Sequence, residues 1–165
     1  MRLRDTGLHF GLVTVIMHWL GAACILSFAT GVLLEAITGS IAIRNAALSI
    51  GAFTACLHLF RFLWRLRNYH PAPLGGANPA QVLVGRGVAL GMLLAGVVLP
   101  VMFWFKEGEA TVSPIGQTWW FAPLFWLGFT CFLLGLLLHL FGVYTHVCKL
   151  KDNSLKRIMG TAIDL

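Results

Sequence analysis

Charged residues are scarce in this chain, and one long stretch contains none. Only 11% of its 165 residues are Asp, Glu, Lys or Arg, less than half the share in a soluble domain, which is about 25%. No such residue occurs from Phe121 to Val147. A chain that is 58% hydrophobic, with a mean hydropathy of +0.83, is a membrane protein by composition.

The chain also lacks paired cysteines. Its four cysteines are far apart and form no C-x-x-C or C-x-x-C-H motif: Cys24, Cys56, Cys131 and Cys148. This spacing argues against a dithiol site, a zinc ribbon and covalent haem attachment. The net charge is +6, but the basic residues lie at the ends of apolar runs and not in one patch, so we expect no nucleic-acid partner.

Four apolar runs are each long enough to cross the roughly 30 Å of hydrocarbon in a bilayer. We expect helices at about residues 10–35, 45–66, 81–105 and 119–148, within one domain that spans residues 1–165. The first run is too long for a signal peptide and is followed by no small-residue cleavage site, so it is expected to be retained. The sequence therefore predicts an all-α transmembrane four-helix bundle.

The distribution of positive charge predicts the orientation of these helices. Of the 12 Lys and Arg residues, only Arg44 and Lys106 fall on the side opposite the N-terminus. Because the cytoplasmic ends of membrane helices carry an excess of Lys and Arg, both termini are expected in the cytoplasm. The basic tail from Lys149 to Arg157 is expected to meet anionic lipid.

Two histidines lie at matched depth in the first and last runs. His18 and His139 are both expected roughly 12–15 Å from the cytoplasmic surface, at 1.5 Å per residue. Imidazoles at one depth on two helices can bind one haem iron from opposite faces, and no carboxylate lies at that depth to complete a zinc site. Alternatively, both rings are structural and hydrogen-bonded to the backbone or to each other.

Further polar side chains gather near the cytoplasmic end. His58 and His146 could be substitute ligands, haem-propionate partners or quinone contacts, or simply interfacial histidines that reach water. Arg61, Arg65 and Arg86 could neutralise haem propionates or a bound quinone, or serve only as positive charges on the cytoplasmic side.

Three segments carry a resemblance to a known family: HFGLVTVIMHWLGA, FRFLWRLRNYHPAP and LHLFGVYTHVCKLKDNSLKRIMG. Their most specific parts are the H-W pair of the first run, the R-x-x-W-R-L that ends the second, and K-D-N-S-L-K-R-I-M in the tail. With these segments the chain resembles the bacterial cytochrome b561 family, four-helix electron carriers of the inner membrane.

The resemblance implies a haem b on the cytoplasmic side, with His18 and His139 as axial ligands. Members usually hold a second, outer haem as well. The positions that would supply its two ligands are Ala47 and Phe125 in this chain. Since both outer ligands are missing, we expect one haem only.

The resemblance also implies an electron-transfer function. Members pass electrons between a quinone pool and a partner, and some oxidise superoxide at the outer face. We therefore expect an electron carrier or oxidoreductase subunit with quinone, quinol or a redox protein as partner. A second hypothesis stays open because the outer ligands are lost: a haem-poor or haem-free subunit that anchors a larger membrane redox complex.

Overall fold

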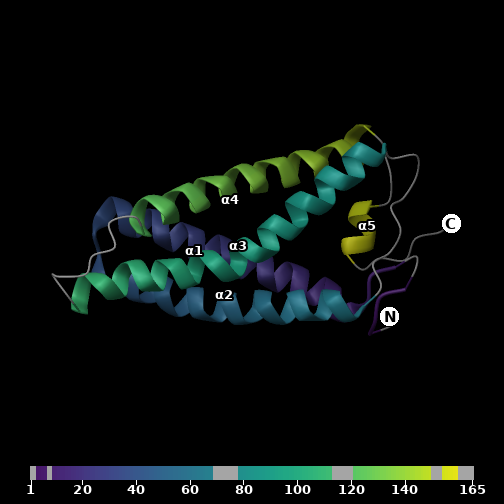
Figure 1. The fold of residues 1–165 in the computed structure, drawn as a ribbon. Coiled ribbons are helices and arrows are strands. Elements are labelled where there is room, and N and C mark those ends of the chain that lie inside the picture. The colour runs from purple at the N-terminus through teal and green to yellow at the C-terminus, as the bar shows by residue number, and fades with distance from the viewer. Residues whose placement is uncertain (1–2, 7–8, 69–77, 113–120, 150–153, 160–165) are drawn as a thin grey trace.

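The chain folds into four long helices, which confirms the all-α four-helix prediction (Figure 1). The structure, a computed structural model, describes residues 3–6, 9–68, 78–112, 121–149 and 154–159. The long helices are α1 (Leu12–Thr38), α2 (Ile41–Arg67), α3 (Pro79–Val112) and α4 (Phe121–Tyr144). After them come a π-helical turn, η1 (Thr145–Lys149), and a short helix, α5 (Ser154–Ile158). Each long helix contains a span long and apolar enough to cross a membrane.

The turn between α1 and α2 is short and tightly specified. Gly39 has a φ of 62° and its N–H bonds to the carbonyl oxygen of Glu35 at 2.8 Å, a left-handed cap that favours glycine. Ser40 then caps α2, with its side chain accepting from the N–H of Ile43. The two helices are therefore antiparallel neighbours.

Consecutive helices pack against one another, α1 on α2, α2 on α3 and α3 on α4. The tightest core lies in the half of the bundle away from the N-terminus and is built from aromatic rings. Phe103 lies 5.7 Å from Phe28 and 5.6 Å from Phe125, and Phe125 lies 5.8 Å from Phe129, between ring centroids. We call these four residues the aromatic core. At these separations the rings stack or meet edge to face, so this half of the bundle is filled.

A group of charges closes the bundle beyond the aromatic core. Arg44 of α2 contacts Glu35 of α1 at 3.1 Å and Glu107 of α3 at 2.8 Å, and Lys106 pairs with Glu107. Glu35 and Glu107 are only 7% and 8% exposed. Buried carboxylates are tolerated when they are paired. The helix α3 continues to Val112, past the end near residue 105 that the sequence predicted.

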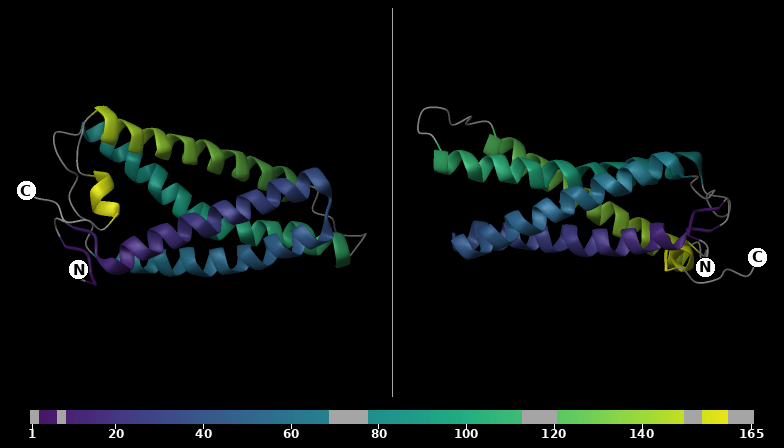
Figure 2. Two further views of the ribbon diagram at one scale, coloured as in Figure 1. Left: turned by 180° about the vertical axis from the view of Figure 1, so that it is seen from behind. Right: turned by 90° about the horizontal axis from the view of Figure 1, so that it is seen from below.

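The opposite end of the bundle is tied by two tryptophans. Trp64 of α2 donates to the hydroxyl of Thr14 on α1 at 3.1 Å, and Trp19 of α1 donates to the carbonyl oxygen of Ile158 in α5 at 3.1 Å. The start of α1 and the helix α5 therefore lie at the same end of the bundle (Figure 2). Which side of the membrane this end faces stays a prediction.

Candidate functional site

The structure brings the two depth-matched histidines together. His18 of α1 and His139 of α4 are both partly buried, and their ring centroids lie 6.4 Å apart with the ring planes tilted by 52°. They come from the first and the last long helix, so the bundle joins residues that are far apart in the sequence.

The spacing of this pair fits a metal ion between the rings. Two imidazoles that bind one metal through bonds of about 2 Å have centroids roughly 6 Å apart, and 6.4 Å is observed. Among the described residues, no group of three or more His, Cys, Asp or Glu could hold a metal ion. The pair therefore suits a metal that brings its own equatorial ligands, as haem iron does, better than zinc, which takes three or four protein ligands.

A third helix adds a positive charge to the pair. Arg61 of α2 donates from Nη2 to Nδ1 of His18 at 2.9 Å. Arginine has no acceptor atom, so this ring nitrogen must accept. A guanidinium at this depth is well suited to an anionic partner such as a carboxylate. Whether Arg61 neutralises a haem propionate or a quinone stays a prediction.

His58 is buried inside the bundle, whereas one interpretation of the sequence placed its ring at the membrane surface in contact with water. Its ring is only 3% exposed, so the interpretation as an interfacial histidine that reaches water is wrong. Nδ1 donates to the carbonyl oxygen of Thr54 at 2.9 Å. The ring packs between Gly21 of α1 and Gly96 of α3, and a Cβ on Gly96 would overlap it. Glycine at both contacts lets three helices close around one imidazole.

The other predicted site residues lie at the same end but outside this cluster. Arg65 is partly buried on the last turns of α2 and Arg86 is exposed on α3, close enough for their charges to interact. His146 is partly exposed in η1. Whether any of the three contacts a cofactor stays a prediction.

The two positions that the resemblance assigns to outer-haem ligands are buried in the core. Ala47 and Phe125 are both fully buried, at 0% exposed. Phe125 belongs to the aromatic core, and Ala47 lies against Gly31, whose Cβ, if present, would be 3.1 Å from that of Ala47. At both positions the helices pack closely against each other.

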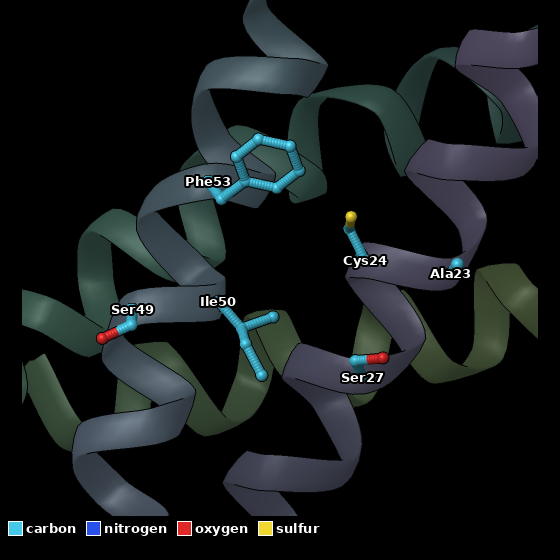
Figure 3. Close-up of a pocket in the computed structure, with 6 residues that line it drawn as sticks. All are labelled: Ala23, Cys24, Ser27, Ser49, Ile50 and Phe53. Carbon is cyan, nitrogen blue, oxygen red and sulfur yellow. The ribbon is translucent and has the colours of Figure 1, made fainter.

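A groove of about 410 Å³ lies between α1 and α2, separate from the histidine pair (Figure 3). Its lining residues are Ala23, Cys24, Ser27, Ser49, Ile50 and Phe53. The lining contains no basic side chain and no imidazole, so it lacks the groups that we considered for contact with a quinone.

Comparison with known proteins identifies the family. No curated protein and no solved structure matches the chain. A family model described as prokaryotic cytochrome b561 matches residues 9–161, a range that includes all four long helices and the histidine pair. The chain therefore belongs to the prokaryotic cytochrome b561 family, a family of b-type haem electron-transfer proteins, and is a multi-pass bacterial membrane protein.

Proposed function

We propose that this protein carries electrons through a single haem b held between His18 and His139. The observation that carries the proposal is the 6.4 Å separation of the two rings, which matches the spacing that two imidazoles on one iron require. When bound, the haem supplies a reversible one-electron carrier.

The histidine pair and the arginines near it make the site suited to electron transfer and positively charged. If His18 and His139 both bound the haem iron, no position would be left for oxygen, which would suit electron transfer over oxygen chemistry. Arg61 places a positive charge beside the pair, where it can compensate the negative charge of propionates. Arg65 and Arg86 extend this positive region toward the cytoplasmic surface.

The packing of the outer half supports one haem per chain. The two positions that would supply the outer ligands, Ala47 and Phe125, are 0% exposed, and neither residue has a metal-binding atom. Phe125 is stacked on Phe129. An outer haem would need both new ligands and removal of aromatic rings.

We further propose that the protein lies in the bacterial inner membrane with both termini in the cytoplasm. Ten of the 12 Lys and Arg residues then face the cytoplasm, including Arg2, Arg67 and Lys149. The haem is closer to that side, so quinone, quinol or a redox protein exchanges electrons there. A reporter enzyme that is active only in the periplasm, fused to the C-terminus, tests this orientation. The fusion should be inactive, and an active fusion would contradict the proposal.

A pyridine haemochrome assay with protein quantification tests the haem directly. We expect one b-type haem per chain in the purified protein. His18→Ala and His139→Ala should each lose the haem, whereas His9→Ala should keep it because residue 9 precedes α1. Two haems per chain, or a full haem content in both ligand variants, would contradict the proposal.

The lost outer ligands favour one rival, a haem-free subunit that anchors a larger redox complex. Under this rival the purified wild-type protein shows no haem band. The double variant His18→Ala, His139→Ala would then assemble and support full activity of the complex. Loss of activity in a variant that still assembles would instead favour the electron carrier.

A further inference from the structure

The hydrogen bond between Arg61 and His18 is incompatible with iron binding by His18. Arg61 Nη2 donates to Nδ1 of His18, so it uses the lone pair of that nitrogen. If iron binds Nδ1, the lone pair is taken. If iron binds Nε2, the neutral ring carries its proton on Nδ1. In both cases Nδ1 can accept nothing, and the guanidinium must find another acceptor.

A second imidazole offers that acceptor. The carbonyl oxygen of Thr54 can only accept, so Nδ1 of His58 donates to it and the lone pair of the neutral ring is on Nε2. This Nε2 and Nη1 of Arg61 each lie 3.5 Å from the place that a Cβ on Gly21 would occupy. The two nitrogens therefore lie over the same point of α1.

The Nε2 atom of His58 is also in need of a partner. The ring is 3% exposed, and the described part of the chain supplies no hydrogen bond to this nitrogen. A buried acceptor without a partner destabilises the fold, because it has lost its hydrogen bond to water. A guanidinium turned toward Nε2 would satisfy it with a charge-assisted hydrogen bond.

Few other acceptors compete for the guanidinium of Arg61 at this end of the bundle. The sequence contains no Asp or Glu between residues 6 and 34, or between residues 36 and 106. Glu35 and Glu107 are held by Arg44 at the opposite end. Asp5, just before α1, accepts from the N–H of Gly11 at 2.6 Å, so the strongest rival is a propionate of the haem itself.

We propose that His58 is a positioning residue, which holds Arg61 beside the histidine pair once His18 has bound iron. The proposal rests on the proposed haem site. The guanidinium turns from Nδ1 of His18 to Nε2 of His58 without leaving the space over Gly21. A positive charge fixed there favours the reduced iron, which carries one positive charge fewer, and so raises the midpoint potential. His58 itself does not bind the iron.

Redox titration of the purified, haem-loaded full chain tests this role, with four proteins compared: wild type, His58→Leu, Arg61→Gln and the double variant. Leucine keeps much of the ring volume and removes the acceptor. In the His58→Leu protein the guanidinium of Arg61 loses its acceptor. If it moves a few ångströms away from the iron, the equilibrium constant for reduction of ferric to ferrous iron should fall roughly threefold. Arg61→Gln should shift the potential the same way, and the double variant should equal Arg61→Gln alone.

A rescue variant separates positioning from packing. His58→Gln keeps an acceptor oxygen and should restore at least half of the shift, whereas the shorter amide of His58→Asn should not. His58→Asn takes the place of His58→Leu if the leucine variant does not accumulate. The low-spin electron paramagnetic resonance signal should be the same in all variants, because His58 is not a ligand.

The possible failures are distinguishable. Additive shifts in the double variant, or no shift in a His58→Leu protein that keeps its haem, would overturn the role of His58 and assign Arg61 to a propionate. A changed ligation signal would overturn it also, by making His58 an axial ligand. A wild-type protein without haem would remove the proposed function together with this inference.

Discussion

Replacing Gly96 with alanine tests the close contact between α3 and the buried imidazole. An ideal Cβ on Gly96 would overlap the ring of His58 at its Cδ2 and Cγ atoms. The ring cannot easily yield, because it is 3% exposed and its Nδ1 is tied to the carbonyl oxygen of Thr54. Either α3 moves outward or this hydrogen bond breaks.

The expected magnitude follows from a comparison with Gly91→Ala on the same helix. Nothing lies within 4 Å of a Cβ on Gly91. Both substitutions remove a helical glycine and gain roughly 0.5–1 kcal/mol, which cancels in the comparison. Overpacking a filled core costs about 1–3 kcal/mol. We therefore expect Gly96→Ala to be less stable than Gly91→Ala by about 1–3 kcal/mol, and by more if the Thr54 bond is lost.

Unfolding in mixed micelles of increasing sodium dodecyl sulfate content, followed by far-ultraviolet circular dichroism, measures this difference. The substitution Gly96→Ala is then repeated in a His58→Ala background, where the missing ring leaves room for the new methyl group and the penalty should disappear. Equal stability of the Gly96→Ala and Gly91→Ala proteins, or a penalty that persists without the ring, would refute the packing argument.

Three further predictions concern the rest of the bundle. Arg44→Leu leaves the carboxylates of Glu35 and Glu107 without their shared partner, and should cost about 2–3 kcal/mol in the same unfolding assay, less than a fully buried pair because Arg44 is 30% exposed. A change under about 1 kcal/mol would contradict this estimate. Phe125→Ala opens a cavity in the aromatic core and should cost about 3–5 kcal/mol, with the haem absorbance per chain unchanged. Trp19→Phe removes the hydrogen bond to α5 and should cost at most about 1 kcal/mol, yet speed tryptic cleavage of the tail.

Composition and depth were enough to predict the helices and the histidine pair. A bilayer admits only spans whose backbone hydrogen bonds are satisfied internally, so long apolar runs predict helices directly. Counting 1.5 Å per residue placed His18 and His139 at one depth, and their rings are 6.4 Å apart in the structure. The haem between them stays a prediction.

The direction in which side chains point was harder to predict. In water the buried face of a helix is more apolar than its exposed face, but in a membrane the side chains that face lipid are as apolar as those in the core. Apolar periodicity therefore did not reveal that His58 faces inward. For the same reason the sequence did not reveal that Glu35 and Glu107 both turn into the bundle toward Arg44.

The filled outer half of the bundle has an electrical consequence. Phe28, Phe103 and Phe125 occupy the space between the histidine pair and the charges around Arg44. If the protein holds the single haem that we propose, near one surface, an electron that arrives from that surface would return to it, and no charge would cross the whole membrane. Moving one charge across 100 mV takes about 2.3 kcal/mol. Under that proposal the protein would neither use nor generate the membrane potential, and its rate of electron transfer would not depend on that potential.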